Sequence, residues 1–209
     1  MKRAPIEPLA SGILLGQATV VAIILVLSGA RTELPVTTAF AGELTTVELG
    51  TAAVVLLVFC GILRLIPRDT RLLEFSQVSG ITVFLIAQLN GTTDVTALVP
   101  LYAIAAGATL FLVLHDRDGD AWTYSFGAAV GIVPWGVIAF AQIGSGLVGD
   151  GPSGIVRVIT LGMLALAIAS WAVIRLITTR PSRAKERAGR ALAVLTPSAL
   201  AWFAVLAGG

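Results

Sequence analysis

The sequence predicts an all-α membrane protein, a bundle of seven transmembrane helices with a short β-hairpin in the first outer loop. Of its 209 residues, 56% are hydrophobic and only 12% are charged, and the mean hydropathy is +0.93. A soluble domain needs about a quarter of its residues charged to cover its surface, so lipid must be the solvent for most of this exterior. The longest predicted loop, Arg31–Glu48, contains a β-branched segment, Glu33–Phe40, which predicts the hairpin.

Seven apolar runs of spanning length follow one another along the chain, separated by charged or turn-forming segments. A helix needs roughly 20 mostly apolar residues to cross the hydrocarbon core. The runs cover residues of about 9–30, 47–66, 72–91, 95–115, 122–145, 154–177 and 189–207. We expect a single seven-helix domain over residues 1–209, with the basic stretch Arg180–Arg190 as a loop before the last span.

The first run leaves one alternative open. Lys2 and Arg3 precede it and Ser28-Gly29-Ala30 closes it, which is also typical of a cleaved signal peptide and would leave six spans. Glu7 interrupts that pattern and the run reaches full spanning length. We therefore favour a retained transmembrane helix.

The basic residues predict the orientation of the bundle. Cytoplasmic loops of membrane proteins carry an excess of Lys and Arg. With the N-terminus inside, the inner side collects 12 of the 14 basic residues, and only Arg31 and Arg157 lie outside. Seven spans then place the C-terminus outside.

Several functional classes lack the residues that they need. A net charge of +2 is too small to suggest nucleic-acid binding, so we expect the lipid bilayer and no nucleic acid as partner. Cys60 and His115 are the only cysteine and the only histidine, so an intrachain disulfide or a zinc site built from His and Cys is out of reach. No nucleophile–base pair stands out, and we predict neither a metal site nor enzymatic activity.

Glu74 is the one clear ionisable candidate within a predicted span, and charge inside a membrane is costly enough to indicate function. Arg71 precedes it by three residues on the same helix face, so one interpretation is an interfacial Arg–Glu pair that anchors the third helix. The other is a counterion or proton-holding acid in the bundle interior, kept neutral by burial. Gln77, Gln88 and Asn90 follow on this helix, and we expect most such groups to form interhelical hydrogen bonds.

Segments in the order of the chain resemble those of the heliorhodopsins, a branch of the microbial rhodopsins. Leu34-Pro-Val-Thr-Thr38 is similar to the family's first outer loop, Gly91-Thr-Thr-Asp94 to its turn between helices three and four, and Glu186-Arg187 to the pair before its last helix. The resemblance covers nearly the whole chain. It implies a rhodopsin-like bundle in a prokaryotic cell (inner) membrane, a cytoplasmic N-terminus, and a homodimer held in part by the outer-loop strands.

The resemblance also implies where a retinal pocket would lie. Arg71-Leu-Leu-Glu-Phe-Ser76 is similar to the third-helix signature whose glutamate is the counterion of the retinal Schiff base. Gly131-Ile-Val-Pro-Trp135 matches the fifth-helix pocket motif, and Ser198-Ala-Leu-Ala-Trp202 resembles the stretch after the retinal lysine. The former pocket positions predicted in this way are Glu74, Pro134, Trp135, Trp171, Pro197, Ser198 and Trp202.

A departure from the family pattern determines the function that we expect. The residue before Ser198, a lysine in the family, is Pro197 here, and proline has no primary amine to form a Schiff base. Lys185 lies in the predicted basic loop and cannot replace it, and the family's serine one turn earlier falls at Ala193. Glu74 is then a counterion without its cation, either neutral or paired with Arg71.

Two hypotheses follow. The first is a heliorhodopsin-like protein without covalent retinal, which works as a non-transporting sensory, signalling or partner-interaction module. In a variant of this hypothesis, it holds retinal, a carotenoid or another apolar ligand non-covalently. The second is a small membrane transporter or channel that uses Glu74. Transport of protons or ions needs a relay of carboxylates through the membrane, and we find none beyond Glu74.

Overall fold

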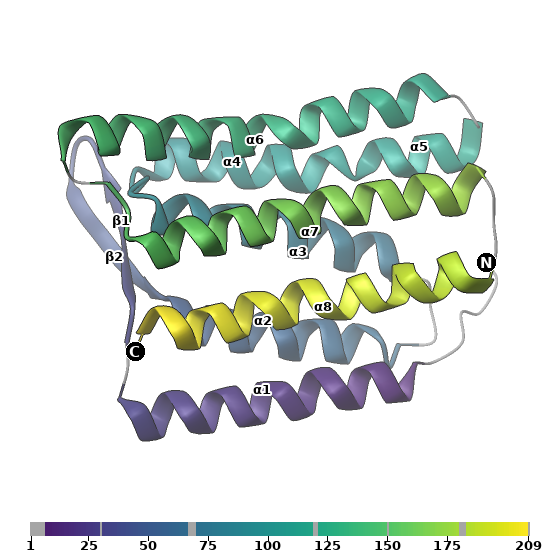
Figure 1. Cartoon of the computed structure of the whole chain (residues 1–209), viewed down its shortest axis with the longest axis horizontal. Helices are drawn as coiled ribbons and strands as arrows, with labels where there is room; N and C mark the ends of the chain where they lie inside the picture. The colour runs from purple at the N-terminus through teal and green to yellow at the C-terminus, as the bar shows by residue number, and fades with distance from the viewer. Residues whose placement is uncertain are drawn as a thin grey trace.

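The computed structural model describes residues 7–29, 31–66, 70–118, 121–149, 151–179 and 183–208. Helices dominate them, and the small hairpin predicted in the first outer loop is present (Figure 1). The elements are, in order, α1 Pro8–Ser28, β1 Glu33–Thr38, β2 Gly42–Glu48, α2 Leu49–Leu63, α3 Arg71–Leu89, α4 Val95–Ala108, α5 Leu110–Asp118, α6 Ala121–Val148, α7 Gly154–Thr179 and α8 Arg183–Gly208.

The helices α4 and α5 together correspond to one predicted transmembrane helix, because only Thr109 separates them. When α4 and α5 are counted as one, the described residues form a bundle of seven helices, which confirms the predicted architecture. Six of these helices are long and apolar enough to cross a bilayer. The seventh, α2, is apolar but has only 15 residues, or roughly 22 Å of helix.

The last helix begins earlier than predicted. The stretch that we expected to be a loop is helical from Arg183 onward, because it is rich in Ala, Arg, Lys and Glu, which are strong helix formers. Lys185 therefore lies in the first turn of α8 and not in a loop. Its ammonium group donates a hydrogen bond to the carbonyl of Leu176 in α7, at 3.3 Å.

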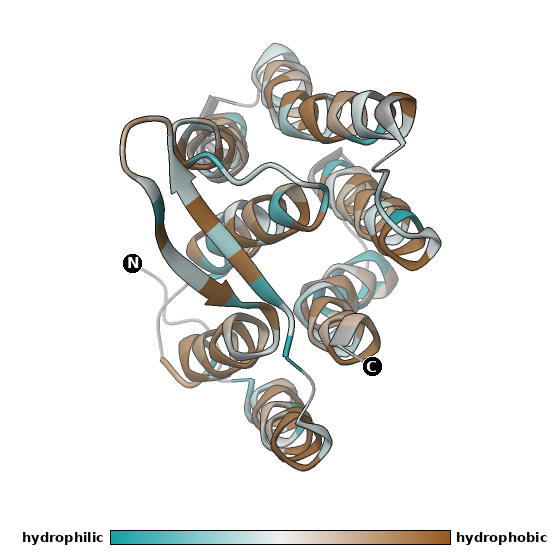
Figure 2. Ribbon diagram, turned by 90° about the vertical axis from the view of Figure 1, so that its left-hand side faces the viewer, coloured by the Kyte–Doolittle hydropathy of each residue, from teal (hydrophilic) through white to brown (hydrophobic). Residues whose placement is uncertain are grey.

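The hairpin is tied to the bundle through the turn after α3. The strands β1 and β2 pair antiparallel, with an irregularity in register between Val36 and Thr37. The backbone N–H of Thr37 donates to the carbonyl of Thr93 at 2.8 Å. Asp94 then caps α4 by accepting a hydrogen bond from the N–H of Thr96. The hairpin lies across one end of the bundle, as Figure 2 shows.

The bundle packs around α3. The helix α1 lies against α2 and α8, α6 lies against α4 and α5, and α7 packs mainly on α8. The contact between α3 and α4 is close because Gly80 faces the ring of Tyr102, where an added Cβ would lie only 2.7 Å from ring carbons. The Tyr102 hydroxyl donates to Oε1 of Gln77 at 2.6 Å, one of the interhelical hydrogen bonds expected of the polar groups on α3.

Candidate functional site

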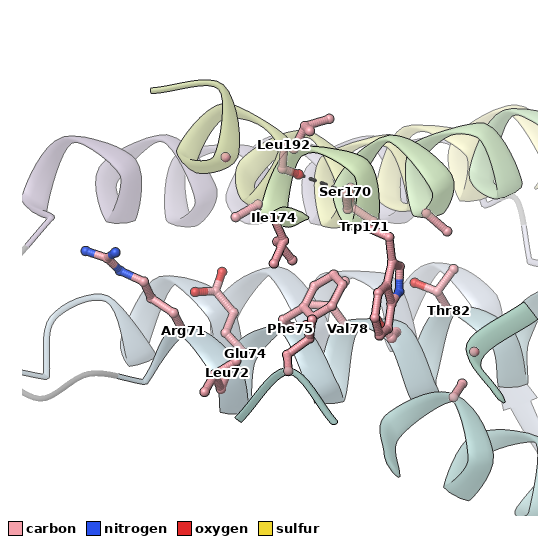
Figure 3. Close-up of a pocket in the computed structure, with 18 of the residues that line it drawn as sticks. Arg71, Leu72, Glu74, Phe75, Val78, Thr82, Ser170, Trp171, Ile174 and Leu192 are labelled. Carbon is pink, nitrogen blue, oxygen red and sulfur yellow. Dashed lines mark hydrogen bonds between the residues drawn. The ribbon is translucent and has the colours of Figure 1, made fainter. Parts of the chain in front are cut away.

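A cavity of about 310 Å³ lies between α3 and the pair α7 and α8, with further walls from α4, α5 and α6. Its walls are largely apolar, and Figure 3 shows Phe75, Ile174 and Trp171 pointing into the space between α3 and α7. The rings of Phe75 and Trp171 meet edge to face, with centroids 6.1 Å apart. This volume lies at the lower end of the range of ligand pockets, roughly 300–1,000 Å³.

One end of the cavity is charged. The lining there contains two carboxylates and two guanidiniums besides Glu74, namely Glu7, Arg71, Glu186 and Arg190. These groups lie near the ends of α1, α3 and α8 that are remote from the hairpin (Figure 1). The cavity therefore runs from a charged end into the apolar centre of the bundle.

Glu74 lines the cavity, and its partner is Arg64 at the end of α2. The Nη2 atom of Arg64 lies 2.7 Å from Oε1 of Glu74, and Nε of Arg64 donates to the same oxygen at 3.0 Å. The side chains are only 5% and 6% exposed. Two hydrogen bonds from one guanidinium give the geometry that makes a buried ion pair tenable.

The predicted pairing of Glu74 with Arg71 is therefore wrong, because Arg64 is the partner of this carboxylate. Arg71 stands in the first turn of α3 with 62% of its side chain exposed, and its Nη2 lies 3.9 Å from Oε1 of Glu7. A long cationic side chain at a helix end turns towards the aqueous boundary, where its charge stays hydrated. Sequence spacing placed both residues on one face but did not determine the direction of the arginine.

Glu7 extends the ion pair into a three-residue cluster. Its Oε2 accepts a hydrogen bond from Nη1 of Arg64 at 3.1 Å, and its backbone N–H donates to the carbonyl of Arg64 at 3.3 Å. Ser11, one turn further along α1, donates to the carbonyl of Gly61 at 2.8 Å. The cluster joins α1, α2 and α3 at the charged end of the cavity.

Arg64 was missed as a site residue, although a signal was present in the sequence. It lies within the predicted span 47–66, between Leu63 and Leu65, and an arginine inside an apolar run needs a buried partner or an exit to water. The orientation argument uses it only as one of the 12 basic residues on the inner side. Its contact with Glu74 depends on how α2 and α3 pack against each other, which the sequence spacing does not give.

The structure brings some of the predicted pocket positions together. Glu74, Trp135 and Trp171 line the cavity. Pro134, Pro197, Ser198 and Trp202 are not among the lining residues.

The four remaining positions lie in different surroundings. Pro134 and Pro197 are buried within α6 and α8. The Ser198 hydroxyl donates to the carbonyl of Val194 at 2.7 Å within its own helix. Trp202 is 39% exposed. The side chains of α8 that do reach the cavity include Leu192, Ala193 and Thr196. The binding roles of the predicted residues stay predictions.

The lining of the cavity bears on whether an aldehyde could be bound covalently. No lysine belongs to its lining within the part of the chain that the structure describes. The chain has only two lysines, of which Lys185 bonds to α7 near the surface and Lys2 lies outside the described residues. The lining therefore offers no primary amine that could form a Schiff base with an aldehyde.

One protein family matches the chain over most of its length. A family model described as Heliorhodopsin matches residues 45–207. The match begins within β2 and reaches Ala207 in α8, so it includes all the helices that line the cavity, α3 to α8. Of the lining residues, only Glu7 lies outside it. No curated protein matches the chain.

Proposed function

The chain belongs to the heliorhodopsin family, and we propose that it works without covalently bound retinal, as a sensory or partner-interaction module of the membrane. The observation that carries this proposal is an apolar cavity whose counterion-like carboxylate, Glu74, is neutralised by an arginine of the same chain. In a pigment that cation would be the Schiff base itself. Here Arg64 supplies the positive charge.

The proposal includes a ligand that binds non-covalently. The aromatic and aliphatic walls of the cavity favour a molecule such as retinal or a carotenoid fragment, since burial of apolar surface contributes about 25 cal/mol per Å². The family's covalent chemistry does not fit the lining residues, because an imine needs a primary amine. We place no step of a mechanism on a bound chromophore.

Addition of retinal to the purified protein tests the covalent part of the proposal. We expect no red-shifted pigment band and no adduct after borohydride reduction. A trapped adduct on this chain would contradict the proposal directly.

Pro197→Lys is the companion test, because by resemblance Pro197 stands at the position of the lysine. The variant should form a visible pigment with retinal, whereas Pro197→Ala, which also removes the proline but adds no amine, should not. If Pro197→Lys folds and remains colourless, the assignment of Pro197 to the lysine position is wrong.

The proposal excludes transport as the main role. The ion pair with Arg64 supports this, because a carboxylate held by two hydrogen bonds is a poor carrier of a mobile proton. Proton or ion flux into liposomes that carry the protein should stay at the background level. Flux that disappears in Glu74→Gln would instead support a transporter or channel.

We also propose an orientation with the N-terminus in the cytoplasm of a prokaryotic cell. The excess of basic residues on one side supports this orientation, 12 against 2. Arg64, Arg71 and Lys185 lie near one end of the bundle and the hairpin lies at the other (Figure 1). Reporter fusions after Thr38 and after Arg183 should report opposite sides of the membrane.

A homodimer through the hairpin completes the proposal. The side chains of β2 are mostly exposed, and Phe40 at the hairpin tip is fully exposed while Leu44 is 54% exposed. Apolar groups at an exposed strand edge favour pairing with another chain. Phe40→Glu combined with Leu44→Glu should shift native mass spectra from dimer to monomer, and an unchanged dimer would place the interface elsewhere.

A further inference from the structure

Thr82 carries an unsatisfied hydroxyl on the wall of the cavity. The residue is only 3% exposed, and its Oγ1 has no hydrogen-bond partner among the described residues. A buried threonine within a helix can satisfy its hydroxyl by donating to the carbonyl one turn earlier. Thr160 and Thr196 do this, at 2.8 Å to Val156 and 3.0 Å to Leu192. Thr82 departs from that pattern, and a buried polar group without a partner costs free energy unless something else supplies one.

The hydroxyl lies at the end of the cavity remote from the charges. Thr82 follows Glu74 by eight residues on α3, which corresponds to roughly 12 Å along the helix axis. Phe75, Val78 and Trp171 line the wall between these two positions. Figure 3 shows Thr82 beyond Trp171 as seen from Arg71, with its hydroxyl turned to the side of the indole.

The charges of the cavity favour neither an anion nor a cation. The carboxylate of Glu74 is neutralised by Arg64. The four other charged groups of the lining are two carboxylates, Glu7 and Glu186, and two guanidiniums, Arg71 and Arg190. A ligand that carried a net charge into the apolar part of the cavity would lose its hydration there and find no partner of opposite charge.

We propose that the cavity binds a neutral, elongated, apolar molecule with one terminal oxygen, a hydroxyl or a carbonyl, which forms a hydrogen bond with Thr82 Oγ1. The proposal rests on the proposed function, since it names the chemistry of the ligand in the same cavity. The apolar body lies against Phe75 and Trp171, and the oxygen forms a hydrogen bond with the buried Thr82 hydroxyl. Thr82 is a specificity-determining residue in this assignment.

The test uses three probes that share one C20 polyene chain and end in an alcohol, an aldehyde or a methyl group. Binding to the protein in lipid nanodiscs is followed by quenching of tryptophan fluorescence, since Trp135 and Trp171 line the cavity. We expect the alcohol and the aldehyde to bind about tenfold more tightly than the hydrocarbon, the effect of one buried hydrogen bond. Thr82→Val, which keeps the shape and removes the hydroxyl, should abolish that ratio, and Thr82→Ser should retain it.

Thr196→Val is the matched control. Thr196 also lines the cavity, but its hydroxyl already donates to Leu192, so the tenfold ratio should persist in that variant. If Thr82→Val does not fold, Thr82→Ala provides the same comparison.

The possible failures can be told apart. Equal binding of all three probes by the unmodified protein overturns the role of Thr82 and leaves the apolar cavity of the proposed function intact. A ratio that survives in Thr82→Val overturns it too, since the oxygen would then lie at the charged end. Failure of every probe to bind contradicts the non-covalent ligand itself, and with it both proposals.

Discussion

The two ends of α3 hold buried polar groups in different ways. At the charged end, Glu74 forms an ion pair with Arg64, and Glu7 joins the cluster. At the hairpin end the polar groups are neutral amides. Nε2 of Gln88 donates to the carbonyl of Pro35 at 3.2 Å, and Nδ2 of Asn90 donates to the hydroxyl of Thr160 at 2.9 Å.

The comparison shows what each end contributes. The amide end fixes the hairpin and α7 with neutral hydrogen bonds, which in membrane proteins contribute about 0.6 kcal/mol each on average. The charged end joins α1, α2 and α3 through groups that must be paired, because an unpaired charge at such a site is far more costly than an unpaired amide. Substitutions that remove a hydrogen-bonding or charged partner at the two ends should therefore lower the free energy of unfolding by amounts that differ several-fold.

Arg64→Met should give the largest effect. Removal of the guanidinium leaves Glu74 buried without a cation, and loss of one partner of a buried ion pair costs about 3–5 kcal/mol. Arg71→Met is the matched control, because this arginine is 62% exposed and 3.9 Å from its carboxylate partner, where a pair contributes about 0–1 kcal/mol. Thermal unfolding in detergent, followed by tryptophan fluorescence, measures both.

The double variant Arg64→Met with Glu74→Gln sharpens this test. It removes both charges, so most of the stability lost in Arg64→Met should return. If instead Arg71→Met is the more destabilised single variant, Arg71 and not Arg64 neutralises Glu74 in the membrane.

Asn90→Leu should give an intermediate effect at the other end of α3. The variant loses the hydrogen bonds of Nδ2 to Thr160 and to the Ile86 carbonyl, but it also removes Oδ1, which has no partner among the described residues. The net loss should be about 1 kcal/mol. In a double-mutant cycle with Thr160→Val the coupling should stay well below that between Arg64 and Glu74, and an equal coupling would remove the contrast between the two ends.

Glu48→Gln should give the smallest effect, and one that depends on pH. Partial burial opposes ionisation of Glu48, but hydrogen bonds from Thr51 and Gly50 outweigh it and hold the pKa of this carboxyl below its ordinary value. A lowered pKa in the folded state gives stability above the unfolded pKa, and this stability is lost as the pH falls through the folded pKa.

As a cap at the start of α2, the carboxylate should contribute about 1 kcal/mol or less at neutral pH. Unfolding temperatures of the unmodified protein and of Glu48→Gln should therefore converge as the pH falls below the ordinary pKa of glutamate and through the lowered pKa of Glu48. A difference between them that does not change with pH would mean that the charge of Glu48 does not stabilise the helix.

Much of the fold could be predicted because the signals are local. The lengths of the apolar runs predicted the helices of the bundle, although α2 is shorter and α8 longer than predicted. The β-branched outer loop gave the hairpin that β1 and β2 form. The break at Thr109 was missed because tertiary packing decides where a helix is interrupted. The early start of α8 was missed because the charge of the stretch predicted a loop, although its residues are strong helix formers.

The candidate site was predictable only in part. The cost of a charge inside a membrane identified Glu74 as the central carboxylate, and the resemblance to a family added Trp135 and Trp171, which do line the cavity. The same reasoning chose the wrong cation and did not single out Thr82. Spacing along one helix shows which residues share a face, but it does not show which side chain turns to water and which turns inward.

The sequence by itself determined that this protein is a helical bundle embedded in a membrane. The reason is that its composition and the length of its apolar runs require lipid as the solvent for most of its surface. The sequence also determined that the two lysines lie outside the predicted spans. Only the tertiary structure decided that Arg64 neutralises Glu74 and that the Thr82 hydroxyl at the cavity wall has no partner among the described residues. The physical reason is that a charge pair and an orphaned hydroxyl are defined by distances between side chains, and helix packing sets those distances.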